Sequence, residues 1–260
     1  MCVECGCNQP VPFGIKVLRA VAPGLLRPSG AAEASAAALA QPPTRSVDLR
    51  IPLLAKNDTL AAKNREFFRR RGMLALNLVS SPGSGKTTLL GRTLDELGSE
   101  LRSAVVVGDL ETDNDARRLT RPNVPVAQVT TGTACHLDAE MVARSLDSMD
   151  LSGVRVLYIE NVGNLVCPAE FDLGEAVRVV LLSTTEGEDK PLKYPPIFKS
   201  ADVVLLTKVD VADVLGFSRE TAAENIRRIA PQARLIQLSA RSGEGMQEWY
   251  SLLRSLMPKP

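Results

Sequence analysis

Short aliphatic runs recur along the chain from Val47 onward and alternate with segments of helical spacing. The runs are continuous Val, Leu, Ile and Ala, which is typical of strands buried on both faces of a sheet. Strands are expected at residues 74–79, 104–107, 124–129, 154–159, 177–182, 203–206 and 235–238. Helices are expected near 87–97, 115–121, 137–149, 219–229 and 246–256, and a further helix is expected to be capped by Asn57-Asp58 and to end near Arg71. This order predicts an α/β domain with a doubly wound, mostly parallel sheet and helices on both faces.

The pattern before Val47 differs. Residues 8–46 contain prolines at 10, 12, 23, 28, 42 and 43, and residues 30–40 are nearly all Ala, Ser and Glu. Such a segment buries too little apolar surface to offset its ordering entropy. We therefore expect three regions: an N-terminal motif at 1–7, a flexible Ala/Pro-rich linker at 8–46, and one domain at 47–260.

Composition excludes several classes of partner. The chain of 260 residues is 45% hydrophobic and 23% charged, with a formal net charge of +1. A near-neutral chain has no electrostatic footprint for nucleic acid or anionic membrane, so neither is expected as a partner. No run approaches the roughly 18–20 apolar residues of a membrane span, and the first residues lack the pattern of a secretory signal. A cytoplasmic protein is expected.

A phosphate-binding loop follows the first strand. Residues 80–88 read Ser-Ser-Pro-Gly-Ser-Gly-Lys-Thr-Thr and stand between a strand and a helix, which is the context of a P-loop. The expected nucleotide-binding residues are Gly83, Ser84, Gly85, Lys86, Thr87 and Thr88. Backbone N–H groups would converge on phosphate oxygens, Lys86 would neutralise the β- and γ-phosphates, and the Thr87 hydroxyl would ligate Mg²⁺. Ser80 departs from the usual pattern, which has glycine at that position.

Two later segments indicate guanine. Thr207-Lys208-Val209-Asp210 follows a strand and resembles the N-K-x-D motif of GTPases, and Ser239-Ala240 follows the next strand. The Asp210 carboxylate can accept hydrogen bonds from guanine N1–H and its exocyclic amine, which adenine does not offer together. The Lys208 stem can pack along the base. GTP is therefore expected in preference to ATP.

Two carboxylates end strands beside the loop. Asp109 and Glu160 can each hold Mg²⁺ or orient the attacking water, as phosphoryl transfer requires, and helix capping is the alternative role. With Lys86 they form the expected catalytic set, and Asp109 is also an expected Mg²⁺ ligand. Gly163 stands where GTPases place a glycine whose N–H contacts the γ-phosphate.

Cysteine and histidine positions indicate a transition-metal site. The five cysteines are an odd number, and the only histidine, His136, is adjacent to Cys135. Cys167 leaves the same expected edge of the sheet, and thiolate with imidazole suits zinc or nickel. Three protein ligands leave the shell incomplete, and a symmetric dimer could complete it. The alternative is two small buried cysteines and a hydrogen-bonded core histidine.

A second metal motif stands at the N-terminus. Cys2, Cys5 and Cys7 lie within six residues, and a terminal amine or amide nitrogen could complete a square-planar set that favours nickel(II). A redox C-x-x-C pair or half of a structural zinc site are the alternatives.

Taken together, residues 1–7, 80–88, 108–113, 131–138, 159–171, 185–193 and 207–210 resemble the hydrogenase nickel-incorporation GTPases of the HypB family, nickel-chaperone P-loop proteins of the signal-recognition/MinD class. The resemblance implies GTP-dependent nickel delivery to the large subunit of [NiFe]-hydrogenase, a GTP-promoted homodimer, and a small zinc-containing partner of the HypA type. It also implies that Cys2, Cys5, Cys7, Cys135, His136 and Cys167 are the metal ligands. Some members carry a histidine-rich nickel store after the first motif, whereas residues 8–46 contain no histidine.

Two other functions stay open from the sequence. One is a related GTPase metallochaperone for a different metalloenzyme, such as urease or a cobalamin enzyme. The other is an ATP-dependent small-molecule kinase whose cysteines are incidental.

Overall fold

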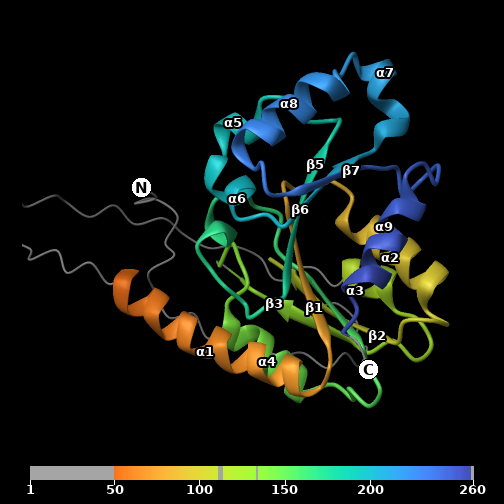
Figure 1. Cartoon of the computed structure of the whole chain (residues 1–260). Helices are drawn as coiled ribbons and strands as arrows, with labels where there is room; N and C mark the ends of the chain where they lie inside the picture. Colours follow the sequence, from red (N-terminus) through yellow and green to blue (C-terminus); the bar gives the residue numbers. More distant parts are fainter. Residues whose placement is uncertain (1–49, 111–113, 133, 259–260) are drawn as a thin grey trace, which may run out of the picture.

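The computed structural model describes residues 50–110, 114–132 and 134–258, so the predicted Cys2, Cys5 and Cys7 site and the 8–46 linker lie outside the described residues. Seven strands form one sheet in the order β3-β2-β4-β1-β5-β6-β7 (Figure 1). The strands are β1 (Leu74–Ser80), β2 (Ser103–Asp109), β3 (Val126–Thr130), β4 (Val156–Glu160), β5 (Val177–Ser183), β6 (Val203–Thr207) and β7 (Arg234–Gln237). All six pairings are parallel, which confirms the predicted doubly wound sheet.

The helices follow the predicted order. They are α1 (Arg50–Arg70), α2 (Lys86–Leu97), α3 (Asn114–Leu119), α4 (Ala139–Asp147), α5 (Lys190–Lys193), α6 (Pro195–Lys199), α7 (Ala212–Leu215), α8 (Arg219–Ile229) and α9 (Met246–Leu256), with 3₁₀ turns η1 (Cys167–Ala169) and η2 (Val209–Val211). The sequence pattern did not predict α5, α6 and α7, because one turn is too short to show helical periodicity. Helix α4 begins later than expected since Asp138 is its N-cap and accepts a hydrogen bond from Met141 N at 2.8 Å.

The predicted cap of the first helix is wrong. Helix α1 begins at Arg50, and Asn57 lies inside it with 5% of its surface exposed. The Asn57 side chain accepts a hydrogen bond from Ala139 N at 2.9 Å and donates one to Asp172 O at 2.8 Å. Asn57 therefore fastens α1 to the first residue of α4 and to the loop before β5, a tertiary role that its local sequence does not distinguish from capping.

The sheet is covered on both faces. Leu74, Leu76 and Leu78 of β1 belong to an apolar cluster with α2 and α9, whereas Ala75 belongs to the cluster beneath α1 and α4. Val79 joins a third cluster with α6 and α8. The continuous aliphatic runs are thus explained, because both sides of each central strand are buried. Within the described ranges, no helix is both long and apolar enough to cross a membrane.

Parallel strands bring their carboxyl ends to one edge of the sheet. The central strand β1 pairs with β4 on one side and β5 on the other. The chain leaves β1 toward β2 and leaves β5 toward β6, in opposite directions along the sheet, so the two connections diverge between these strands. That divergence opens the crevice in which doubly wound proteins bind ligands. The expected site residues therefore converge here, although they are distant in the sequence.

Candidate functional site

The P-loop has the backbone conformation that its two glycines predict. It joins β1 to α2, and Gly83 and Gly85 have φ angles of 73° and 98°. Side-chain-bearing residues rarely adopt this left-handed region, so both glycines are required by the turn. Helix α2 starts at Lys86, and its N-terminus faces the loop.

Lys86 is buried below the loop. Its Nζ donates a hydrogen bond to Ser80 Oγ at 2.8 Å, and burial lowers its pKa against the opposing effect of the Glu160 carboxylate. Ser80 is fully buried. The residue that departs from the usual glycine therefore holds the lysine that is predicted to bind phosphate, a role that the sequence did not reveal.

Thr87 and Glu160 form the centre of the predicted magnesium and catalytic site. Thr87 Oγ1 donates a hydrogen bond to Glu160 Oε1 at 2.7 Å. Glu160 is 3% exposed, and burial raises its pKa to about 7, against the lowering effects of Lys86 and the Thr87 hydrogen bond. Its Oε2 is buried and has no hydrogen-bond partner among the described residues. The Thr87 hydroxyl is a hard oxygen of the kind that Mg²⁺ prefers, and the Glu160 carboxylate lies directly beside it.

Asp109 and α3 flank the same site. Asp109 ends β2 as predicted, and its Oδ1 accepts a hydrogen bond from Leu110 N at 2.7 Å. Arg118 of α3 donates to Thr88 Oγ1 at 3.1 Å and pairs with Asp115 at 3.2 Å. The Asp115 charge contributes to the raised pKa of Glu160 and opposes the burial that lowers the pKa of Lys86. Asp115 and Arg118 were not predicted, because no motif marks a charge on a short helix.

The predicted base-binding residues surround one pocket. It is lined by Ser84, Gly85, Thr88, Leu89, Thr207, Lys208, Asp210, Val211, Leu238, Ser239, Ala240 and Arg241. Lys208 has a positive φ of 59°, and its Nζ donates to Gly83 O at 2.7 Å, so its stem crosses the P-loop. Thr207, which replaces the asparagine of the usual motif, donates its hydroxyl hydrogen bond to Ser84 O at 2.8 Å.

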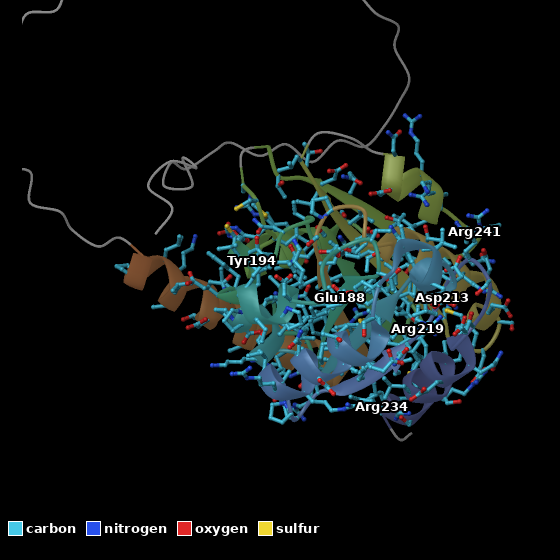
Figure 2. The ribbon with its side chains drawn as sticks, turned by 90° about the horizontal axis from the view of Figure 1, so that it is seen from above. Glu188, Tyr194, Asp213, Arg219, Arg234 and Arg241 are labelled. Atoms are coloured by element: carbon cyan, nitrogen blue, oxygen red, sulfur yellow. The ribbon has the colours of Figure 1, made fainter. Side chains whose placement is uncertain are left out.

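Other residues brace this pocket. Ser84 Oγ donates to Glu186 Oε1 at 2.9 Å, and the same oxygen accepts from Ser183 N at 3.1 Å. Arg219, labelled with Arg241 in Figure 2, donates to Val209 O at 2.6 Å and pairs with Glu244 at 3.0 Å. Glu186 and Arg219 were not predicted as site residues, since their contacts join segments far apart in the chain.

Cys135, His136 and Cys167 come together as the sequence predicted. Their ligand atoms all lie within 4.8 Å of one another, and each residue is half-buried. Two ligands on one metal ion lie at most about 4.6 Å apart when each metal–sulfur bond is about 2.3 Å. The three side chains therefore need only a small rotation to share one ion, so they fit zinc or nickel.

Cys135, His136 and Cys167 are called the metal triad below because of the metal site predicted for them, and its imidazole packs against an aromatic ring on one side. The His136 ring stacks on Phe171 with ring centroids 3.9 Å apart, and Nδ1 lies 3.8 Å from Cys135 Sγ. Burial lowers the pKa of His136, against the opposing charge of Asp138. A lowered pKa favours the neutral imidazole, which is the form that ligates metals.

The segment after β4 joins the two sites. Glu160 stands at the Thr87 hydroxyl and Cys167 stands in the metal triad. Between them, a Cβ placed on Gly163 would lie 2.9 Å from the Cα of Pro82, so this segment packs directly on the P-loop and requires glycine there.

Comparison with known proteins identifies a family of similar chains. The family model described as "CobW/HypB/UreG, nucleotide-binding domain" matches residues 74–237. A hydrogenase maturation factor HypB from Azotobacter chroococcum is 52% identical over 220 residues, covering 85% of this chain and 72% of that protein. Among solved structures, HypB from Archaeoglobus fulgidus has a TM-score of 0.74 at 40% identity, over 78% of this chain and 99% of that one. HypB from Helicobacter pylori, solved in complex with nickel, has a TM-score of 0.73 at 39% identity, over 78% and 98%.

Proposed function

Because the chain belongs to the HypB family of hydrogenase maturation factors, within the CobW/HypB/UreG nucleotide-binding domains, we propose that it is a GTP-hydrolysing metallochaperone that delivers nickel during [NiFe]-hydrogenase maturation. One observation carries the proposal. The segment from Glu160 to Cys167 begins at the P-loop threonine and ends in a triad of nickel-type ligands. An ATP-dependent kinase does not require metal ligands on the segment that follows its P-loop contact.

GTP is the nucleotide that the pocket favours. Asp210, Ser239 and Ala240 line the pocket together with the Lys208 stem, which supports guanine selectivity through the Asp210 carboxylate. The phosphates would lie on residues 83–88, where Lys86 supplies the counter-charge.

Hydrolysis would use the groups at the strand ends. Thr87 and Asp109 would hold Mg²⁺, which when bound neutralises charge on the β- and γ-phosphates. Glu160, whose pKa is raised to about 7, can accept a proton from an attacking water or orient it. The Gly163 N–H would contact the γ-phosphate and so report its loss.

Nickel is the cargo of the Cys135, His136 and Cys167 triad, and zinc suits the same donors. A GTP-promoted homodimer would complete the coordination shell with a second set of ligands. The Cys2, Cys5 and Cys7 motif would be a separate nickel site on the 8–46 linker. A HypA-type factor and the hydrogenase large subunit are the proposed partners, in the cytoplasm.

Nickel and nucleotide binding should affect each other. The γ-phosphate orders a segment that also carries Cys167, so the nucleotide state should change nickel affinity, and nickel should change nucleotide affinity by the same factor. A typical coupling is about 1–3 kcal/mol, or roughly 5–150-fold, enough for loading in one state and release in the other.

A titration tests the proposal. Nickel affinity would be measured with GDP and with a non-hydrolysable GTP analogue, in the full chain with Cys2, Cys5 and Cys7 replaced by alanine, while the oligomeric state is followed. We expect different affinities and a dimer with the GTP analogue. Equal affinities and the same oligomeric state in both would refute nucleotide-controlled delivery. Selective binding to a urease or cobalamin-enzyme maturation factor would instead show that the chain delivers metal to that enzyme rather than to a hydrogenase.

A further inference from the structure

Two asparagines after β4 hold the loop that carries two of the metal ligands. Asn161 Oδ1 accepts a hydrogen bond from Leu137 N at 3.1 Å, and Asn164 Nδ2 donates one to Cys135 O at 3.3 Å. The two bonds bracket His136 in the chain. Together they fix the backbone on both sides of that imidazole.

The same asparagines are tied to the nucleotide site. Asn161 directly follows Glu160, and its N–H donates to Leu78 O of β1 at 3.0 Å. Gly163 stands between the two asparagines and packs on Pro82 of the P-loop. A displacement of Gly163 by the γ-phosphate would therefore move Asn164 relative to Asn161.

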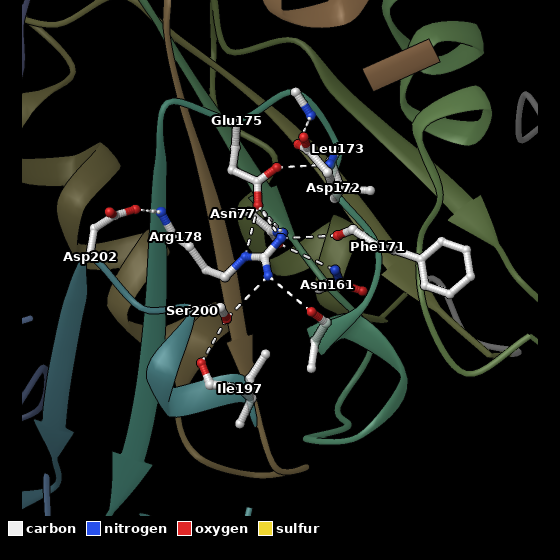
Figure 3. Close-up of polar contacts among 12 residues, drawn as sticks. Asn77, Asn161, Phe171, Asp172, Leu173, Glu175, Arg178, Ile197, Ser200 and Asp202 are labelled. Carbon is white, nitrogen blue, oxygen red and sulfur yellow. Dashed lines mark hydrogen bonds and ion pairs between the residues drawn. The ribbon is translucent and has the colours of Figure 1, made fainter. Parts of the chain in front are cut away.

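A buried polar network fixes the Asn161 amide. Its Oδ1 also accepts from Val162 N at 2.9 Å, and its Nδ2 donates to Asn77 Oδ1 at 3.2 Å. Asn77 Nδ2 in turn donates to Glu175 Oε1 at 3.1 Å, as Figure 3 shows. Because two N–H donors face Oδ1, only one orientation of the Asn161 amide satisfies the site.

The other end of the network contacts the turn that carries Cys167, the third residue of the metal triad. Arg178 donates to Glu175 Oε1 at 2.9 and 2.7 Å, and their side chains are 11% and 6% exposed (Figure 3). Arg178 also donates to Phe171 O at 3.0 Å, and its Nη1 lies 3.5 Å from Ala169 O. Ala169 shares the turn η1 with Cys167, and Phe171 carries the stacked imidazole. A buried, fully paired network has few alternative arrangements, so it resists independent movement of its parts.

Building on the proposed nickel function, we propose that Asn161 and Asn164 are positioning residues that transmit the nucleotide state to the metal triad. Neither ligates the metal or touches the nucleotide in this assignment. They act as an amide clamp, defined as these two side chains, between the Glu160–Gly163 backbone and the Cys135–Leu137 loop. The network from Asn77 to Arg178 supplies the fixed frame against which the clamp moves the ligands together or apart.

Nickel titrations of clamp variants test this inference. In the full chain with Cys2, Cys5 and Cys7 replaced by alanine, Ni²⁺ binding would be followed by thiolate-to-nickel charge-transfer absorption, with GDP and with a non-hydrolysable GTP analogue. We expect the ratio of the two affinities, on the order of 5–150 before the clamp is changed, to fall to about one in Asn161→Ala/Asn164→Ala. Asn164→Ala alone should lower it part of the way.

Asn64→Ala is the matched control. Asn64 is also a buried amide, and it donates to Ala139 O at 2.9 Å and Leu173 O at 3.0 Å, which lie just after the same two metal-ligand segments. Asn64 lies in α1, however, and is far from Glu160 in the sequence, so it does not belong to the segment that follows β4. The control should lose stability, as measured by thermal unfolding, yet keep the affinity ratio. An equal fall of the ratio in Asn64→Ala would show a merely structural effect and overturn the clamp.

The outcomes separate the two proposals. Absence of nickel binding before any clamp substitution would refute the proposed function itself. Nucleotide-dependent binding that persists in the double variant would refute only the clamp, and a ratio of one before the clamp is changed would overturn it as well. If Asn161→Ala does not fold, Asn164→Ala decides, because Asn164 is only half-buried; an unchanged ratio there overturns the proposal.

Discussion

Replacing Glu160 by glutamine should remove a pH-dependent loss of stability from the nucleotide-free protein. Glu160 is 3% exposed, and burial raises its pKa from 4.5 to about 7. Glutamine has nearly the same shape, keeps an oxygen that can accept from Thr87 Oγ1, and carries no charge at any pH. The substitution therefore isolates the cost of the buried charge.

The sign and size follow from the two pKa values. Below about pH 4.5 the carboxyl group is protonated in both the folded and the unfolded chain, so it contributes no pH dependence there. As the pH rises toward 7, the unfolded chain releases the proton first, and the folded chain becomes less stable relative to it. At about 1.4 kcal/mol for each pKa unit, the rise from 4.5 to about 7 corresponds to about 3 kcal/mol of lost stability.

Urea unfolding at pH 5, 6, 7 and 8 measures this effect. The free energy of unfolding of Glu160→Gln minus that of the parent should increase by about 2–3 kcal/mol across this range, since part of the loss has already occurred at pH 5, and should level off above pH 7. Titrating groups away from Glu160 cancel because both chains carry them, whereas Lys86 interacts directly with the Glu160 charge. Glu224→Gln, on an exposed position of α8, is the control and should give a profile parallel to that of the parent. A parallel profile for Glu160→Gln as well would refute the buried charge and its proposed role beside the γ-phosphate.

Three further substitutions test the nucleotide site. Asp210→Asn should weaken GTP about 10- to 100-fold, because a charged acceptor for two guanine donors is lost; unchanged GTP affinity in a binding assay would contradict the base assignment. Lys86→Ala should lower GTP hydrolysis by about 100-fold or more and leave the nickel affinity of the Cys2–Cys7 motif unchanged. A large loss of that nickel affinity would show that the N-terminal motif docks on the domain. Gly163→Ala would place a Cβ 2.9 Å from the Cα of Pro82 and should cost about 1–3 kcal/mol of nucleotide binding, measured by calorimetry; full affinity would show that this packing is unimportant.

Local patterns accounted for the main elements and for the loops that end them. The P-loop could be predicted because strand, glycine-rich turn and helix are adjacent in the chain, and Gly83 and Gly85 have the positive φ angles that such a turn needs. Asp109 and Glu160 could be predicted as strand ends for the same reason. The pairing of Cys135 with His136 is visible in the sequence without any tertiary information.

Contacts between distant segments could not be predicted in this way. In the sequence, Ser80 is only a departure from the P-loop motif. The structure shows that its hydroxyl accepts a hydrogen bond from Lys86. Asn57 reads as a helix cap until its bonds to Ala139 and Asp172 show it inside α1. An amide or hydroxyl has the same local preference whether it caps a helix or bonds across the fold, so its partner decides its role.

The sequence by itself therefore determined the class of the fold, the type of nucleotide loop and the chemistry of the metal ligands, because each depends on neighbouring residues and on the periodicity of buried strands. Glu160 and Cys167 are only seven residues apart in the chain, so the sequence alone also indicated that the predicted nucleotide and metal sites share one segment. Only the tertiary structure decided which groups of the P-loop this segment contacts. The strand order places β4 beside β1, so Glu160 meets Thr87 while the chain beyond it runs past the P-loop to Cys167. Which strands become neighbours depends on how the whole set of apolar faces packs, and that is a property of the entire chain rather than of any one stretch of it.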